Sequence, residues 1–296
     1  MSRFVNRIFT QVKHPLRNDA SRLSHNLWHT HTYTNWGEPW GEAMRTGQVE
    51  SRIVNQAFYK RNLFPRMLGW FLIRLADRKQ QCTSLEDVEW AMSEAAGFDA
   101  GYAMTIRAKT FRRHGQIDRL LEAIRNWDYL REKQAFTEEQ RARLRDPQTE
   151  WHLEKQNDRL FKLYPLHISK YYTCNLGEMQ PGQPGGSDWS WTTPCPGRFA
   201  VRLKVEGDGA IENPQFTTPE GVIKFPCTVK EHQYLLYTFD GKAVVTDKNY
   251  NVVQTVVPEG EALMPVSFSC SLISEDAPDV VIRFMTLGEP ETVEVR

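Results

Sequence analysis

Continuous apolar runs and helical periodicity alternate along the first part of the chain. Met67–Ile73 is a continuous apolar run with the length of a buried strand, and Ala100–Ile106 is a second short run of the same kind. Between them, Thr83 and Glu86 have the spacing of a capping box, which predicts a helix that begins there and ends at Gly97. The pattern therefore predicts a strand, a helix and a second strand in succession.

Further helices flank this unit. Val49–Asn62 and Ile117–Trp127 carry apolar residues at helical spacing, and Thr137-x-x-Gln140 is the capping box of another helix. Upstream, Leu23–Trp36 has the composition of an extended segment, and it enters a Gly- and Pro-containing loop at Gly37–Gly41. Strands that alternate with helices predict a parallel sheet built of βαβ units, an α/β fold.

The second part of the chain has a different pattern, with short β-rich runs separated by turn residues. Asp240-Gly241 and Lys248–Asn251 have the composition of hairpin turns, and Gln180–Ser187 has that of a linker or long turn. Seven runs of this kind predict an antiparallel β-sandwich, jelly-roll-like or Ig-like. They are Arg198–Val205, Gly221–Phe225, Tyr234–Phe239, Ala243–Thr246, Val252–Val257, Val266–Leu272 and Val280–Met285.

Length and charge agree with two domains. A chain of 296 residues has room for one or two, and we expect an α/β region over residues 1–165 and a β-sandwich over residues 166–296. The formal net charge is zero, but residues 1–165 carry an excess of 7 basic groups and residues 166–296 an excess of 7 acidic ones. Because the basic residues are scattered among acidic ones, we expect no nucleic-acid partner. No apolar run is long enough to predict a membrane span.

The cysteines and the first residues bear on the compartment. The five cysteines show neither a C-x-x-C pair nor the spacing of a disulfide framework, so we expect most of them to be buried thiols. Met1–Arg7 lacks the apolar region of a secretory signal, which taken literally indicates a cytoplasmic protein.

Three segments of the first region resemble the closing part of a (β/α)8-barrel glycoside hydrolase. They are Thr34–Glu42, Met67–Phe71 and Ala96–Tyr102, and the first contains an Asn-x-x-Glu-Pro sequence similar to the Asn-Glu-Pro of many retaining glycosidases. The resemblance implies a partial barrel followed by an accessory sandwich. It also implies that the chain begins inside the barrel, so that an upstream barrel half or a second copy of the chain is an expected partner. The protein would then be periplasmic or secreted.

The resemblance implies a carbohydrate substrate and carboxylate acid/base chemistry without a cofactor. Glycoside hydrolysis uses two carboxyl groups on either side of the scissile bond, and Glu38 and Glu42 are the candidates. If a helix starts at Pro39, their four-residue spacing brings the β-carbons about 5–6 Å apart. The alternative for Glu42 is a solvated acid in a first helical turn.

Aromatic and polar residues near the two carboxylates are candidate substrate contacts. Tryptophan rings stack on the apolar faces of sugars, while polar neighbours bind the hydroxyl groups. The candidate substrate-binding residues are Trp28, His29, His31, Asn35, Trp36, Trp40 and, after the strand Met67–Ile73, Arg74. His29 and His31 share one face of a strand, so together with Asp19 they could instead hold a metal. Asp99 precedes a strand, where we expect structural capping rather than chemistry.

The expected function is therefore a glycosidase, or the C-terminal part of one, acting on a polysaccharide or glycan. The alternatives are a non-catalytic protein that binds carbohydrate or a partner through its sandwich, and a metal-dependent hydrolase. The chain has no G-x-G-x-x-G, Walker A, G-x-S-x-G or H-E-x-x-H sequence, so nucleotide-dependent and serine-hydrolase functions have no local support.

Overall fold

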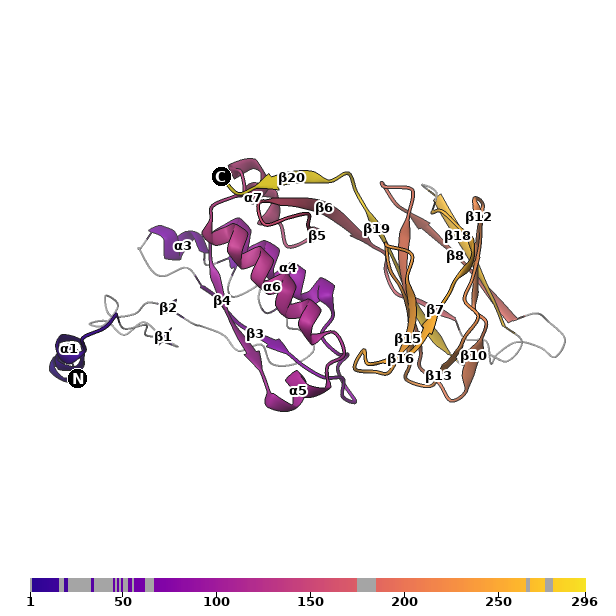
Figure 1. Cartoon of the computed structure of the whole chain (residues 1–296), viewed down its shortest axis with the longest axis horizontal. Helices are drawn as coiled ribbons and strands as arrows, with labels where there is room; N and C mark the ends of the chain where they lie inside the picture. Colours follow the sequence, from indigo (N-terminus) through magenta and orange to yellow (C-terminus); the bar gives the residue numbers. More distant parts are fainter. Residues whose placement is uncertain are drawn as a thin grey trace. The chain divides into compact units, whose positions relative to one another are not determined.

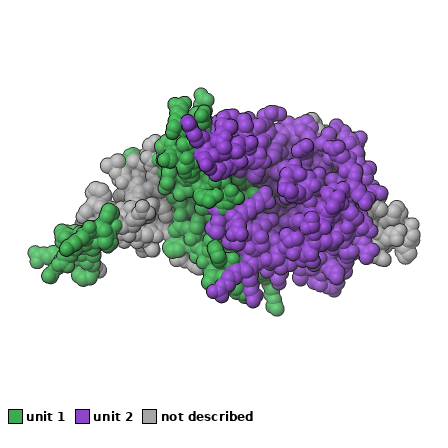
Figure 2. Space-filling view, viewed as in Figure 1, with its two compact units in different colours: residues 1–111, 122–148, 294–296 green, residues 112–121, 149–293 purple. Residues whose placement is uncertain are grey.

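The computed structural model divides the chain into two compact units (Figure 2). The first comprises residues 1–111, 122–148 and 294–296, and the second residues 112–121 and 149–293. The structure describes residues 2–15, 19–20, 33–34, 45, 47, 49, 53–54, 56–61, 67–174, 185–264, 267–274 and 279–296.

Helices and short parallel strand pairs make up the first region (Figure 1). The helices are α1 (Ser2–Gln11), α3 (Gln56–Arg61), α4 (Leu85–Phe98), α5 (Ala108–Arg113), α6 (Ile117–Glu132) and α7 (Glu138–Leu144). The strands are β1 (Asp19–Ala20), β2 (Tyr33–Thr34), β3 (Met67–Ile73) and β4 (Gly101–Ile106).

The predicted strand–helix–strand unit is confirmed as β3–α4–β4. The two strands pair in parallel, with Phe71 opposite Met104 and Ile73 opposite Ile106. Leu68, Phe71 and Ile73 are fully buried, which explains why β3 is an uninterrupted apolar run. The fold is thus mixed α/β in this part of the chain, as predicted.

The boundaries of α4 differ from the prediction. The capping box is formed by Ser84 and Asp87: the Asp87 N–H donates to the Ser84 hydroxyl oxygen over 3.3 Å, and the Ser84 N–H donates to the Asp87 carboxylate over 3.1 Å. Thr83 instead accepts the Arg74 N–H through its hydroxyl oxygen. Two overlapping sequences satisfy the capping pattern here, and Ser84 is the residue with the extended N-cap backbone.

Helix α4 ends at Phe98, with Asp99 as its C-cap, rather than at Gly97. Asp99 has φ of 51°, in the left-handed region, and its N–H donates to the last turn of the helix. This confirms the predicted capping role of Asp99. Gly97 lies inside the helix, where a β-carbon would come within 2.8 Å of the Leu144 and Arg145 backbone. The glycine therefore serves close packing of α4 on α7.

Buried aromatic residues join the helices of the first unit. The Trp127 ring stacks on Phe136 with 5.7 Å between centroids, and its indole N–H donates to buried Glu89 on α4. The predicted capping box at Thr137 and Gln140 is confirmed at the start of α7. In the part of the chain that the structure describes, no helix is long and apolar enough to cross a membrane.

The second unit is built of antiparallel strands in two main sheets (Figure 1). The nine-stranded sheet contains β16 (Val252–Val256), β15 (Ala243–Thr246), β14 (Tyr234–Tyr237), β9 (Phe199–Val205), β19 (Val280–Leu287), β6 (Leu160–Ile168) and β20 (Glu291–Glu294), with β5 (Glu150–Lys155) and β7 (Tyr172–Cys174) beside them. The five-stranded sheet has the order β17 (Glu259–Glu261), β12 (Gly221–Lys224), β11 (Gln215–Thr218), β18 (Ser267–Ser274) and β8 (Gly185–Thr192). A small pair, β10 (Ala210–Glu212) and β13 (Thr228–Lys230), completes the unit.

One apolar core lies between the two sheets. Leu203 on β9 and Phe284 on β19 meet Phe216 on β11 and Ile223 on β12, and all are at most 2% exposed. Alternate residues of β19, including Val280 and Ile282, point into this core, as expected for strands with one buried face. The predicted antiparallel sandwich is confirmed.

All seven predicted strands of the sandwich are present, as β9, β12, β14, β15, β16, β18 and β19. The turn at Asp240-Gly241 joins β14 to β15, and Lys248–Asn251 joins β15 to β16, as predicted. The predicted linker at Gln180–Ser187 needs correction, since Gly185–Ser187 pairs with β18 as the start of β8. Strands β5 and β6 were not predicted from the sequence. Strand β6 includes residue 165, and the domain boundary expected at that residue remains a prediction.

Three cysteines are free thiols: Cys82 and Cys227 are buried, and Cys195 is partly buried. Burial raises the pKa of the Cys227 thiol to about 11, so it stays protonated and unreactive at neutral pH.

Candidate functional site

Most of the site residues expected from the sequence lie outside the described residues. These are Trp28, His29, His31, Asn35, Trp36, Glu38, Trp40 and Glu42. Nearby, β1 pairs in parallel with β2, which places the Asp19 backbone opposite that of Tyr33. The grouping of these side chains into one site therefore remains a prediction.

Arg74 follows the carboxyl end of β3, as the sequence indicates. Its side-chain Nε–H donates to the Gln81 carbonyl over 3.3 Å, and its backbone N–H donates to Thr83 over 2.9 Å. Its carbonyl accepts the Thr83 N–H in return. These bonds close the loop between β3 and α4, so Arg74 has a structural part in that loop.

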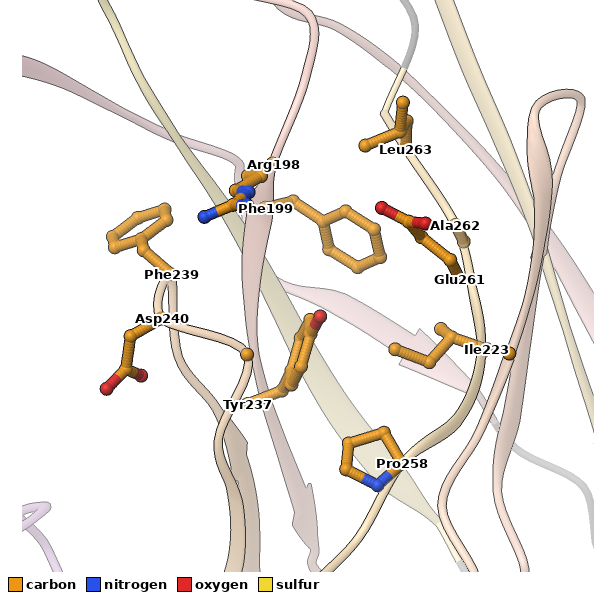
Figure 3. A pocket seen from close by; sticks show the side chains of 12 residues that line it. Arg198, Phe199, Ile223, Tyr237, Phe239, Asp240, Pro258, Glu261, Ala262 and Leu263 are labelled. Atoms are coloured by element: carbon orange, nitrogen blue, oxygen red, sulfur yellow. The ribbon is translucent and has the colours of Figure 1, made fainter.

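The described residues contain an open cleft in the β-sandwich (Figure 3). It has a volume of about 290 Å³ and lies between the ends of the two sheets. The nine-stranded sheet contributes residues of β9, β14 and the β14–β15 turn, and the five-stranded sheet contributes residues of β12 and β17. The lining residues are Arg198, Phe199, Ile223, Tyr237, Phe239, Asp240, Gly241, Pro258, Gly260, Glu261, Ala262 and Leu263.

Backbone pairing fixes the walls of the cleft. Gly197 and Met264 exchange two backbone hydrogen bonds of 2.8 and 3.0 Å, which tie the two sheets together next to Arg198 and Leu263. On the five-stranded sheet, Gly260 pairs with Ile223 at φ of 78°, and a β-carbon there would come within 2.4 Å of a backbone oxygen. Only glycine fits this position without strain.

Aromatic rings form the floor of the cleft. Phe199 is buried, and Tyr237 packs edge-on against both Phe199 and Phe225, with centroids 5.8 and 5.3 Å apart. Tyr237 and Phe239 are half-buried, so each keeps part of its ring at the cleft surface. Tyr237 ends β14 and packs against the sandwich core, whereas Phe239 lies in the following turn and packs against a separate cluster of Leu166, Ala200 and Met285.

Charged side chains surround this aromatic floor. Arg198 just before β9, Asp240 in the β14–β15 turn and Glu261 in β17 are exposed and line the cleft (Figure 3). Asp240 is held by the Thr238 hydroxyl over 2.5 Å and the Lys242 ammonium over 2.6 Å. These hydrogen bonds lower the pKa of Asp240 to about 2, so the carboxylate is ionised at neutral pH.

Tyr237 stays a neutral phenol in this setting. Burial raises the pKa of Tyr237, and the Glu261 carboxylate raises it further, while Arg198 opposes them. The side chain therefore presents an apolar ring together with a hydroxyl that can donate or accept a hydrogen bond.

A second polar group adjoins the cleft through Phe239. The His152 ring lies 6.3 Å from both Phe239 and Tyr164, and its Nε2 lies 3.6 Å from a Glu154 carboxylate oxygen. Hydrogen bonding to His152 is the main cause of a lowered Glu154 pKa, and burial raises the pKa of Tyr164. The hairpin β5–β6 thus adds an imidazole, a carboxylate and a phenol beside the aromatic floor.

Sequence reasoning treated the cleft residues as parts of a strand and a turn. The available signal was the pair of aromatic residues Tyr237 and Phe239 at the end of a predicted strand, followed by the turn sequence Asp240-Gly241. It was overlooked because the partners Arg198 and Glu261 are distant in the chain.

Neither a metal centre nor a relative identifies the chemistry. Among the described residues, no group of three or more His, Cys, Asp or Glu side chains has the arrangement of a metal site. Comparison of the chain with protein-family models, curated proteins and solved structures found no match. The functional conclusion therefore depends on the geometry of the cleft.

Proposed function

We propose that the protein binds a carbohydrate in the cleft of its β-sandwich. The observation that carries the proposal is the pair of half-buried rings, Tyr237 and Phe239, surrounded by the exposed charges of Arg198, Asp240 and Glu261. Sugars have apolar C–H faces and polar edges, so a ring floor with a polar rim complements both. Ligand sites commonly combine aromatic walls with a few polar groups in this way.

The size of the cleft favours a short ligand. Its volume of about 290 Å³ is at the lower end of the roughly 300–1,000 Å³ found for ligand pockets. The cleft is open to solvent, and His152, Glu154 and Tyr164 lie just beyond Phe239. A chain end bound in the cleft could therefore extend its next hydroxyl groups toward this hairpin.

Removal of the aromatic floor tests the proposal. We expect Phe239→Ala to weaken glycan binding about tenfold, because it removes a stacking surface worth roughly 1–1.5 kcal/mol. Tyr237→Phe, which keeps the ring and loses only the hydroxyl, should reduce affinity less. Calorimetric titration against neutral, acidic and amino sugars measures both effects.

Tyr171→Ala is the matched control, since Tyr171 is an exposed aromatic residue of the same unit that does not line the cleft. Thermal unfolding of each variant checks that the sandwich is intact. Failure of every sugar class to bind the unmodified protein would refute the proposal. Equal binding by Phe239→Ala would show that any sugar site lies elsewhere.

We also propose, as a second function, that the first region has the glycosidase chemistry expected from the sequence. The supporting observation is the parallel β3–α4–β4 unit, the building block of a (β/α)8 barrel, with Arg74 after the carboxyl end of β3. Glu38 and Glu42 are the proposed carboxyl groups. In this proposal the sandwich would bind the glycan on which the first region acts.

A further inference from the structure

The β16 strand is an exposed edge with an apolar surface. It ends the order of the nine-stranded sheet, and β15 is its pairing partner in the described part of the chain. Val252, Val253 and Val257 are 61%, 58% and 77% exposed. An exposed edge strand with apolar side chains offers unpaired backbone groups to another strand.

Charged side chains, which normally protect such an edge, are absent from Val252–Val257. The edge strand β17 of the other sheet differs in this respect, because it consists of Glu259, Gly260 and Glu261. Pro258 follows Val257 and, lacking an N–H, ends the stretch that can pair.

Within this stretch, Val253 and Val257 are placed symmetrically about Thr255. Val256 is buried in the sandwich core, so its neighbours Thr255 and Val257 belong to the opposite face of the sheet. Val253 lies where the β15–β16 register shifts, and it is 58% exposed. If two copies paired in antiparallel fashion about a twofold axis at Thr255, Val253 of each copy would lie opposite Val257 of the other. The two Thr255 residues would then lie opposite each other. Cross-strand β-branched and Thr–Thr pairs of this kind stabilise antiparallel sheets.

The charges next to the strand agree with antiparallel pairing. Exposed Lys248 lies in the turn before β16, and exposed Glu259 and Glu261 follow it. Antiparallel pairing brings the basic start of one strand beside the acidic end of the other. Asp247, also near the start, is engaged by the turn itself through hydrogen bonds from Asn249 and Asn251.

We propose that two copies of this chain associate through β16, in an antiparallel pair centred on Thr255 that joins their nine-stranded sheets. A contact of about five residues from each copy is smaller than a standard interface of roughly 1,200–2,000 Å². The dimer is therefore weak and depends on protein concentration. This association is independent of the proposed sugar site.

Sedimentation velocity of the full chain over an about hundredfold concentration range tests the association. The mass should rise from that of the 34.4 kDa chain toward twice that value. Val253→Lys, which places a charge at the paired edge, should raise the dimer dissociation constant at least tenfold. Val222→Lys is the matched control, since Val222 is an exposed valine on an inner strand of the other sheet.

A cysteine at the proposed axis tests the register. Thr255→Cys should form an intermolecular disulfide under mild oxidation, because residue 255 faces its own copy at about 4.5–5.5 Å between β-carbons. Val252→Cys, at an equally exposed position opposite Pro258, should not. A mass that stays monomeric throughout, a dimer unaffected by Val253→Lys, or equal cross-linking of both cysteines would each overturn the proposal.

Discussion

Phe284→Ala is expected to lower the free energy of unfolding of the sandwich by about 3–5 kcal/mol. Phe284 is fully buried at the centre of the core, with ring centroids 5.7 Å from Phe216, 6.1 Å from Tyr172 and 6.4 Å from Phe199. The substitution removes apolar surface and leaves a cavity between two sheets whose strands are fixed by hydrogen bonds, so little relaxation can fill it. The loss is a large share of the roughly 5–15 kcal/mol that stabilises a typical domain.

Equilibrium urea unfolding of the full chain, followed by circular dichroism in the β-sheet region, measures this loss. Val281→Ala is the control, because Val281 is on the same strand and only partly buried. It should cost at most about 1 kcal/mol, the span of β-propensity. Similar small losses for both variants would show that Phe284 does not join the two sheets in a common core.

Glu38→Gln is expected to reduce glycan turnover by about 10²–10⁴-fold, if the proposed glycosidase chemistry is correct. Glutamine keeps the size of the side chain but can neither donate nor accept the proton at the scissile bond. Trp40→Ala should instead raise KM with less effect on kcat, because it removes stacking surface without touching proton transfer. Steady-state kinetics on a panel of glycans separates the two effects.

Glu122→Gln, at an exposed position of α6, controls for the loss of a negative charge. It should leave turnover unchanged. The catalytic proposal fails if the unmodified protein turns over no glycan, or if Glu38→Gln and Trp40→Ala both leave turnover and binding unchanged. Neither result bears on the proposal that the sandwich cleft binds carbohydrate, because the Phe239→Ala titration tests that proposal separately.

Local sequence patterns predicted much of the secondary structure. Met67–Ile73 is a continuous apolar run because β3 is largely buried. In Arg198–Val205 and Val280–Met285, buried and less buried residues alternate because one face of each strand lies in a core. The capping box at Thr137 and the turn at Asp240-Gly241 are short-range hydrogen-bonding devices, and both were located correctly. These features depend on residues within a few positions of one another.

Other features needed the tertiary structure. Strands of three or four residues, such as β10, β13 and β17, carry too few positions for a period to be recognised, and their partners complete them. At α4 the sequence allowed two overlapping capping boxes, and the backbone conformation of Ser84 decided between them. The β5–β6 hairpin belongs to the large sheet because β6 pairs with β19, a strand more than a hundred residues later.

The candidate cleft is the clearest case of this division. Its aromatic residues, Tyr237 and Phe239, were visible as part of a strand, and their position beside a turn followed from the sequence. Arg198 and Glu261 join them only because Gly197 pairs with Met264 and β17 pairs with β12, which brings the ends of two sheets together. Periodicity determines which face of a strand is buried, whereas a binding site requires side chains from distant segments, and long-range backbone pairing alone selects them.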